Sequence, residues 1–231
     1  MLRLKAIILG AIGVIAETSD IQRQSFNLAF QEQGLNWDWD ARVYRQLLSI
    51  NGGQARLRSY RDADSARSDV SDAAIAALHA SKTRHYAALT SAGSLVPRRG
   101  IAQLIEAAKT AGVKVALCTS TSPENVDALR TALGAQLDWS AFASITTIDK
   151  IGRVKPAPDA YLHCLAQLGL RADEVVAIED TPVSMASAMA AGIAVIATPG
   201  AMTDNQDFSG AALITDDLAT LTLQRIDAIL A

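Results

Sequence analysis

From Gly100 to the end of the chain, short apolar runs alternate with segments whose apolar residues recur at helical spacing. The apolar runs predict strands, and the intervening segments predict helices. The predicted strands are Val113–Cys118, Ala143–Thr146, Glu174–Ile178, Ala194–Ala197 and Ala212–Ile214; the predicted helices are Ile101–Thr110, Pro123–Leu133, Pro158–Leu168, Pro182–Ala190 and a last one from Leu218. Strands that alternate with helices form a parallel sheet with helices on both faces. The alternation therefore predicts the α/β class, with a doubly wound parallel sheet.

The segment from residue 17 to residue 89 interrupts this pattern, because its apolar residues recur at helical spacing and predict no strand. The earlier apolar run Ala6–Leu9 could not bury both of its faces alone, so it has to join the sheet of the later strands. We expect a core of residues 1–16 and 90–231, and a helical cap of residues 17–89 inserted after the first strand. Such a cap would close over a small ligand and exclude water.

The composition narrows the range of partners. The 231 residues are 50% hydrophobic and carry a net charge of −3 with no run of like charge, so neither nucleic acid nor a membrane is an expected partner. Cys118 and Cys164 lie in apolar stretches, which favours reduced core residues and a cytoplasmic location. The apolar run from residue 6 to residue 16 also resembles a secretory signal, but we favour a buried strand.

Hydroxyl residues follow one predicted strand, at the edge where a sheet of this kind binds its ligands. Thr119 ends the strand, and Ser120, Thr121 and Ser122 lead into a helix that begins at Pro123. Hydroxyls and free backbone amides at a helix start favour an anion, so Thr119 and Ser120 are candidate phosphate-binding residues. The alternative for Ser120 to Ser122 is an ordinary helix cap.

Charged residues stand at two further strand ends. Lys155 is flanked by prolines that stiffen the chain, and it is either a charge partner for phosphate or a solvated side chain. Glu179 and Asp180 leave an apolar strand side by side, and such a pair typically holds a hard cation. The alternative for Asp180 is a cap for the helix that begins at Pro182. We therefore expect Lys155 to bind phosphate and Glu179 with Asp180 to form a metal site.

Taken in order, these segments resemble the four signature motifs of the haloacid dehalogenase (HAD) superfamily, over the whole chain. The segments are Lys5–Leu9 with Gly13, then Thr119, then Lys155–Asp159, and last Glu179 with Asp180. Within the superfamily the chain is most similar to CbbY-type phosphosugar phosphatases, through Ala16-Glu17-Thr18, Gly52-Gly53, Thr203-Asp204 and Phe208. The resemblance implies a HAD-like, Rossmann-type core with a helical cap. It also implies a magnesium-dependent phosphatase of sugar phosphates, notably xylulose 1,5-bisphosphate.

The first motif departs from the family at both of its acidic positions. The family reads Asp-x-Asp-Gly, with a nucleophilic and an acid–base aspartate, whereas this chain has Gly10 and Ile12 in their places. Glycine cannot form an aspartyl-phosphate. Loss of a hydrolase nucleophile costs on the order of 10⁶ in kcat, so we expect turnover near background. The family's Gly-Gly-Lys in the cap ends here in Gln54, which removes a cationic contact to the substrate.

The resemblance also assigns the metal positions. The family's magnesium uses the nucleophile, a backbone carbonyl two residues later and the motif-four aspartate, which leaves here the carbonyl of Ile12, Asp180 and Glu179. We therefore expect magnesium to bind weakly or not at all. Glu17 falls just after the first strand and Arg56 falls beside the Gly-Gly turn of the cap, so we expect both to contact the sugar end of the ligand; the alternative is that both are surface charges.

Other residues that could suggest a site are interpreted as structural. Trp37 and Trp39 flank Asp38 and favour packing over an aromatic platform. The histidines show no spacing typical of metal ligands. They are His79, His85 and His163.

Two functions fit these observations. The first is a catalytically impaired HAD relative that keeps a pocket for a phosphorylated small molecule, a sugar phosphate above all, or that binds a partner protein. The second is an active phosphohydrolase in which Asp180 holds a magnesium ion that activates water. We favour the first, because both motif-one carboxylates are absent while Thr119 and Lys155 are present.

Overall fold

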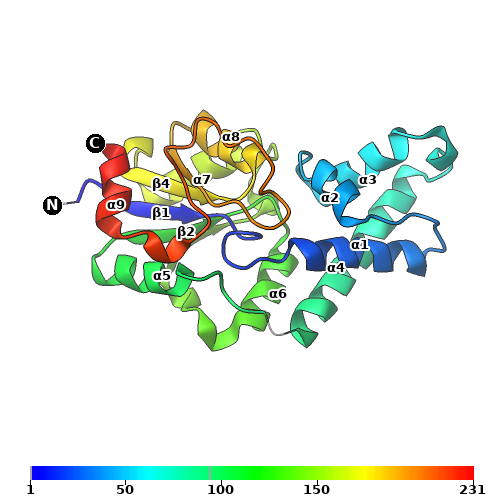
Figure 1. Cartoon of the computed structure of the whole chain (residues 1–231), viewed down its shortest axis with the longest axis horizontal. Helices are drawn as coiled ribbons and strands as arrows, with labels where there is room; N and C mark the ends of the chain where they lie inside the picture. The colour runs from blue at the N-terminus through cyan, green and yellow to red at the C-terminus, as the bar shows by residue number, and fades with distance from the viewer. Residues whose placement is uncertain (1, 94) are drawn as a thin grey trace.

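The computed structural model describes residues 2–93 and 95–231. Within them, six parallel strands form one sheet in the order β3-β2-β1-β4-β5-β6. The strands are β1 (Ala6–Leu9), β2 (Lys114–Cys118), β3 (Phe142–Thr146), β4 (Val175–Glu179), β5 (Ala194–Ala197) and β6 (Leu213–Ile214). Figure 1 shows this sheet at one end of the molecule and a group of helices at the other. The prediction of a doubly wound parallel sheet is confirmed.

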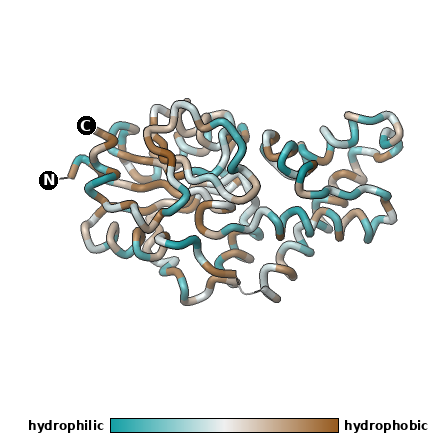
Figure 2. The backbone as a smooth tube through the Cα atoms, viewed as in Figure 1, coloured by the Kyte–Doolittle hydropathy of each residue, from teal (hydrophilic) through white to brown (hydrophobic). Residues whose placement is uncertain are grey.

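Helices cover both faces of the sheet because successive strand residues point to opposite sides. From β1, Ile7 and Leu9 pack with α5 (Ile101–Thr110), α6 (Pro123–Leu133) and α9 (Leu223–Asp227). Ala6 and Ile8 pack on the other side with α7 (Asp159–Leu168) and α8 (Pro182–Ala190). Figure 2 shows hydrophobic stretches of the trace where the sheet lies, in keeping with burial of the strands on both faces.

The register of the central strands decides which residues meet at the carboxyl edge. In β1, Leu9 lies level with Leu117 of β2 and Ile178 of β4. The next residue, Gly10, donates a backbone hydrogen bond of 3.0 Å to the carbonyl of Ile178. Gly10 therefore stands directly beside Glu179, the last residue of β4.

Four helices fold apart from the sheet, between β1 and α5. They are α1 (Ser19–Glu32), α2 (Ala41–Leu47), α3 (Gly53–Asp62) and α4 (Asp72–Ala92). We call them the helical region. α1 packs along α4, and α4 also packs against α6 of the core.

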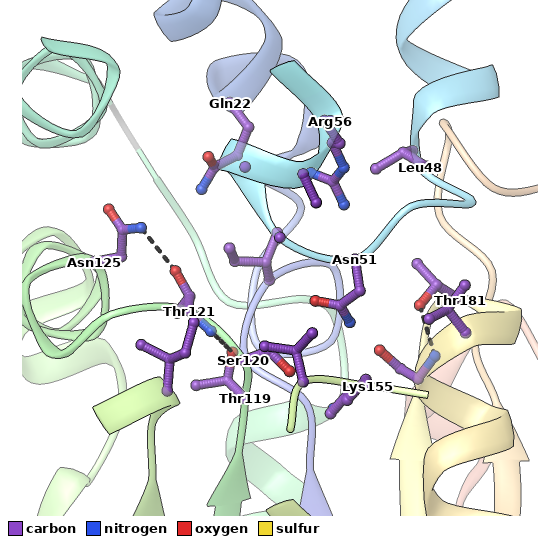
Figure 3. Close-up of a pocket in the computed structure, with 18 of the residues that line it drawn as sticks. Gln22, Leu48, Asn51, Arg56, Thr119, Ser120, Thr121, Asn125, Lys155 and Thr181 are labelled. Atoms are coloured by element: carbon purple, nitrogen blue, oxygen red, sulfur yellow. Dashed lines mark hydrogen bonds between the residues drawn. The ribbon is translucent and has the colours of Figure 1, made fainter. Parts of the chain in front are cut away.

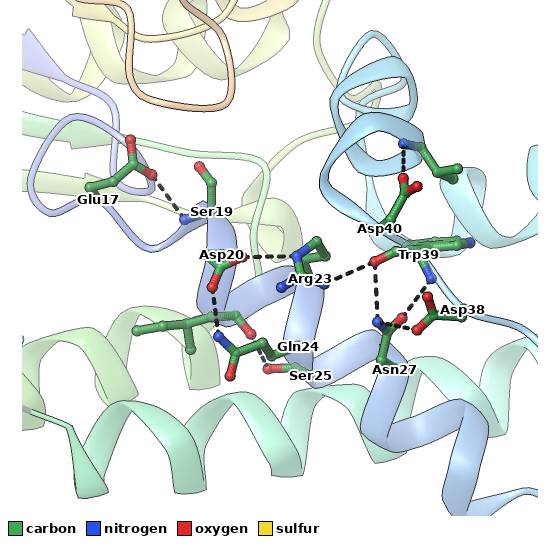
Figure 4. A network of polar contacts seen from close by, with 12 residues as sticks. Glu17, Ser19, Asp20, Arg23, Gln24, Ser25, Asn27, Asp38, Trp39 and Asp40 are labelled. Atoms are coloured by element: carbon green, nitrogen blue, oxygen red, sulfur yellow. Dashed lines mark hydrogen bonds and ion pairs between the residues drawn. The ribbon is translucent and has the colours of Figure 1, made fainter.

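The helical region has an aromatic core of its own. Trp39 is fully buried, with its ring centroid 4.5 Å from that of Phe26 and 5.1 Å from that of Phe30. Asn27 holds the backbone of Trp39 through two hydrogen bonds, of 2.9 and 3.1 Å (Figure 4). Trp37 packs edge-on against Phe30 at 5.4 Å. The interpretation of both tryptophans as packing residues is confirmed.

Apart from the last helix, the predicted elements of the core begin and end within one residue of those in the structure, and two of the differences have a visible cause. The strand expected from Glu174 begins one residue later, because the carboxylate of Glu174 caps a short 3-10 turn through the amide of Arg171 at 3.0 Å. The single helix expected from Leu218 is divided into a 3-10 turn and the short α9. Asp217 caps the first piece, and Thr222 starts the second. Side chains that bond to nearby backbone amides interrupt helices in this way.

Neither cysteine is exposed. Cys118 and Cys164 are free and buried, as their apolar surroundings predict, and burial raises the pKa of the Cys164 thiol to about 12. Among the described residues, no helix combines the length and the apolar composition that a membrane crossing requires.

Candidate functional site

A cavity of about 430 Å³ lies between the carboxyl edge of the sheet and the helical region (Figure 3). Both parts of the chain supply its walls. From the core it is lined by Gly10, Ile12, Thr119, Ser120, Lys155, Glu179 and Asp180; from the helical region it is lined by Gln22, Gln54, Arg56, Arg58, His79 and Lys82. The structure thus brings together the predicted phosphate and metal residues with Arg56. Figure 3 shows Gln22 and Arg56 above the space and Thr119, Ser120 and Lys155 below it.

Glu179 fills the space that Gly10 leaves open. A Cβ atom added to Gly10 would lie 2.5 Å from Oε2 of Glu179 and 2.9 Å from Cγ2 of Val14. Real Cβ atoms essentially never come so close to another heavy atom, so no larger residue fits at position 10 unless both Glu179 and Val14 shift. Glycine and the inward carboxylate are therefore complementary.

The carboxylate of Glu179 forms a buried ion pair with Lys155. The Lys155 ammonium donates a bond of 2.5 Å to Oε1 of Glu179, and both side chains are almost fully buried. The Tyr161 hydroxyl donates to the same oxygen, and the ammonium also donates to the Cys118 carbonyl at 3.2 Å. Burial alone would lower the pKa of Lys155, but the charge and hydrogen bond of Glu179, together with the charges of Cys118 and Asp180, outweigh it, and the pKa is raised.

This pairing gives Glu179 partners within the chain, and its predicted role as a metal ligand stays a prediction. We expected a metal ligand, but Oε1 is bonded to Lys155 and Tyr161, and Oε2 faces the Gly10 backbone. Lys155 lines the cavity as expected, yet its charge is already neutralised by Glu179. Because a buried lysine left without a carboxylate would be strongly destabilising, the pairing stabilises the charged form of Lys155.

Asp180 lies beside Glu179 and is also buried. Burial raises the pKa of Asp180 well above its usual range, and the charges of Glu179 and Glu17 raise it further. Its carboxylate packs against Gly13, whose positive φ of 80° favours glycine. Asp180 does not cap the following helix, because Thr181 is the N-cap of α8 and accepts from the Ser184 amide at 3.3 Å.

The hydroxyl residues after β2 have free hydrogen-bonding capacity. Thr119 accepts a bond of 3.1 Å from the Thr121 amide, which leaves its own hydroxyl proton available. The Ser120 hydroxyl and the Asn125 carbonyl oxygen are buried without a partner in the described part of the chain. Ser122 stands at the N-cap of α6 but accepts no side-chain capping bond. An unsatisfied buried polar group costs about 1–3 kcal/mol, so this edge is suited to a ligand that makes those bonds.

The helical region contributes basic side chains to the cavity, of which the sequence analysis proposed only Arg56. Arg56, which was expected, donates from Nε to the carbonyl of Ile50 at 2.8 Å, and its guanidinium lies 5.8 Å from the Tyr44 ring centroid. Lys82 and His79 line the cavity from α4, although neither was proposed. Gln54 lines it as well, and its amide oxygen accepts from Arg58 at 3.3 Å.

Glu17 is not among the residues that line the cavity. Its carboxylate accepts the Ser19 amide at 3.0 Å at the start of α1, and it packs against the backbone of Gly200 (Figure 4). The expected contact of Glu17 with a sugar stays a prediction, since the charge of Glu17 acts on the cavity residue Asp180. Its side chain is also needed where the chain leaves the core for the helical region, because the first amides of α1 lack helical partners.

The donor set of the cavity does not fit a magnesium ion. Magnesium requires near-octahedral oxygen ligation, in proteins usually with one or two carboxylates and substrate phosphates. Gly10 and Ile12 offer no side-chain oxygen, Glu179 is paired with Lys155, and only Asp180 is left. In the ranges 2–93 and 95–231, no group of three or more His, Cys, Asp or Glu residues is arranged to hold a metal.

The fold and this edge define a haloacid dehalogenase-like hydrolase, and the chain belongs to that family, whose sequence profile matches residues 4–192. It is related to the CbbY proteins. CbbY of Rhodobacter capsulatus is 40% identical over 225 residues, which span 97% of this chain and 98% of the relative. The plasmid-borne CbbY of Cupriavidus necator is 43% identical over 220 residues, 93% of this chain and 86% of the relative. The HAD superfamily and the CbbY likeness are thus confirmed.

Solved structures agree with these relatives. An aspartate-to-asparagine variant of CbbY from Rhodobacter sphaeroides, in complex with xylulose-(1,5)bisphosphate, superimposes with a TM-score of 0.88 at 34% identity and 96% coverage of both chains. The same protein in complex with phosphate gives a TM-score of 0.87. A phosphoglycolate phosphatase of Rhodospirillum rubrum is a more distant relative, 26% identical over 94% of this chain. The chain is therefore phosphatase-like.

Proposed function

We propose that this chain binds a phosphorylated sugar between core and helical region, with little or no covalent phosphoryl transfer. The phosphate would contact Thr119 and Ser120, and the sugar would extend toward Arg56. In this proposal, residues 17–89 act as the cap that covers the ligand. The relatives support the ligand class, because CbbY binds xylulose-(1,5)bisphosphate and phosphate.

One observation carries the catalytic part of the proposal. Glu179 occupies the space beside Gly10 where the nucleophilic carboxylate implied by the resemblance would extend, and Lys155 is committed to Glu179. A nucleophile has to approach phosphorus, whereas the Glu179 carboxylate is held by two donors away from the open cavity. The pocket therefore retains hydroxyls and cations for binding while the reactive carboxylate is absent.

The alternative of metal-activated water at Asp180 receives less support. A carboxyl group whose pKa is raised favours its protonated form, which is a poor ligand for a hard cation. With only one free carboxylate, magnesium binding would depend almost entirely on the ligand's phosphates. We therefore propose weak magnesium binding at most.

Calorimetry tests the binding proposal. Inorganic phosphate and xylulose 1,5-bisphosphate, titrated without metal, should bind the wild type, and a ligand at 100 times its Kd should stabilise the fold by about 2.7 kcal/mol. Thr119→Val removes the hydroxyl at nearly constant volume. It should weaken binding by about tenfold, because one hydrogen bond to a charged group is lost. Thr110→Val, at an exposed position in α5, is the matched control. If millimolar phosphate does not bind the wild type, or binds the wild type and Thr119→Val equally, the proposed site is wrong.

A further inference from the structure

Lys82 is a buried lysine without a carboxylate partner. It lies on α4 with 3% of its surface exposed, and it lines the cavity. Its ammonium donates to the amide oxygen of Gln22, and Nζ lies 5.1 Å from the ring centroids of both Phe26 and Tyr86. Among the described residues, no Asp or Glu oxygen lies within 4.0 Å of it. A neutral amide and two aromatic rings compensate a buried positive charge only in part.

The groups that face Lys82 weaken its hold on a proton. Burial lowers the pKa of Lys82 to about 7, and the positive charge of Arg56 on α3 contributes. His79, one turn earlier on α4, has a pKa lowered to about 4 and is neutral at pH 7. Burial raises the pKa of Tyr86, so it stays neutral too. From α1, Gln22 and Phe26 do not titrate.

A lysine in such surroundings differs in chemistry from a surface lysine. At pH 7 a group with a pKa of about 7 is roughly half free amine, on the order of 10³ times the fraction of a lysine at its ordinary pKa. A free amine carries a lone pair, and desolvation or a neighbouring cation is how lysines become nucleophiles toward carbonyl groups. For plain anion binding, a permanently charged arginine would serve better.

We propose that the Lys82 amine condenses reversibly with the aldehyde or ketone carbonyl of a phosphorylated ligand and holds it as an imine. This inference rests on the proposed function for the phosphate end of the ligand. Thr119 and Ser120 line the core side of the cavity and Lys82 lines the helical side. Figure 3 shows Gln22, the hydrogen-bond partner of Lys82, facing the Thr119 loop across the space. A ligand with a phosphate at one end and a carbonyl at the other can contact both walls.

The reaction balances without an oxidant or a reductant. The nitrogen lone pair attacks the carbonyl carbon, a C–N bond forms, and the C=O π pair moves to oxygen, which takes a proton from nitrogen. The resulting carbinolamine loses its hydroxyl group with the second nitrogen proton as water, and a C=N bond forms. An amine and a carbonyl compound thus give an imine and water, and the reverse reaction releases the ligand.

Pyridoxal 5′-phosphate, which carries both an aldehyde and a phosphate, is a direct probe. We would incubate the full chain with it at pH 7.5, reduce with borohydride, and locate the added mass by peptide mapping. Lys82 should be modified at least about tenfold faster than the exposed Lys109, in keeping with its larger free-amine fraction. Modification confined to exposed lysines would overturn the proposal.

Variants and a second probe separate this inference from the proposed function. Lys82→Arg keeps a cation but cannot form an imine, so labelling at this position should be lost while phosphate binding persists in calorimetry. If phosphate binds the wild type but Lys82 is never labelled, the imine is wrong and the binding site stands. If pyridoxal without phosphate labels Lys82 as fast as pyridoxal 5′-phosphate, the amine chemistry holds and the phosphate site is wrong.

Discussion

Oε2 of Glu179 lies 2.5 Å from the point at which a Cβ atom on Gly10 would stand. The two residues are neighbours across β1 and β4, and one supplies the space that the other fills. The Glu179 carboxylate thus stands beside Gly10 and keeps Lys155 paired. The predictions below begin with this pair.

Lys155→Met should lower the free energy of unfolding by about 3–5 kcal/mol, because it leaves the Glu179 carboxylate buried and unpaired. Adding Glu179→Gln should recover much of that loss, since no charge is then left behind. Urea denaturation measures both. The control is Arg153→Met, which breaks the exposed pair with Asp159 and should cost at most about 0.5 kcal/mol. Equal losses in Lys155→Met and the control would contradict the role of the pair.

Gly10→Asp with Ile12→Asp should restore only weak magnesium-dependent phosphatase activity, because Glu179 blocks the new side chain and competes for Lys155. Adding Glu179→Ala removes the closest obstruction, leaves only a small shift of Val14 to be made, and should transfer Lys155 to the new carboxylate. Initial rates on xylulose 1,5-bisphosphate should then rise by at least about tenfold, equivalent to about 1.4 kcal/mol of activation free energy. The control is a second triple variant, in which Gly10→Asn replaces Gly10→Asp. Asparagine has the shape of aspartate without its charge, so this variant should release no phosphate. A double variant faster than the triple one would show that Glu179 does not obstruct the site.

The stability of the wild type should depend on Lys82 between pH 7 and 10. The pKa of Lys82 falls from 10.5 in the unfolded chain to about 7 in the fold. In that window the unfolded state therefore binds more protons, and stability rises with pH by at most about 1.4 kcal/mol per unit. Lys82→Met removes this contribution. The difference between the two urea-unfolding curves should grow in favour of the wild type as pH rises; a constant difference would mean that the pKa of Lys82 is ordinary.

Arg98 should be a main stabiliser of the loop after β1. Its guanidinium donates to the carbonyls of Gly13 at 2.7 Å, Thr198 at 2.8 Å and Pro199 at 3.2 Å. Arg98→Met should lower the free energy of unfolding by about 2–4 kcal/mol, since several carbonyls lose a charged donor. The neighbouring Arg99→Met, at a highly exposed side chain, should change it by less than about 0.5 kcal/mol. Similar melting temperatures of the two variants would refute the assignment.

The sequence was sufficient for the sheet and for most of the residues at its edge. Strand ends and helix starts are local features, so Thr119, Lys155 and Asp180 were placed correctly at one edge. The direction of the Glu179 side chain could not be predicted, because it depends on the space beside Gly10, a contact between residues far apart in the sequence.

Lys82 was missed although a signal was present. It shares an apolar stripe with Ile75, Leu78 and Tyr86 at spacings of three and four residues, and a lysine in such a stripe is expected to be buried. What the sequence could not show is that this face of α4 reaches the cavity, because that depends on how α4 packs across α1.

Phosphate release by the wild type tests the central claim most directly. Because Gly10 cannot accept a phosphoryl group and Glu179 is held by Lys155 and Tyr161, p-nitrophenyl phosphate and xylulose 1,5-bisphosphate should release no phosphate above background. This result should be the same with and without magnesium. Turnover of about 1 s⁻¹ or more, in the range of ordinary enzymes, would contradict the account.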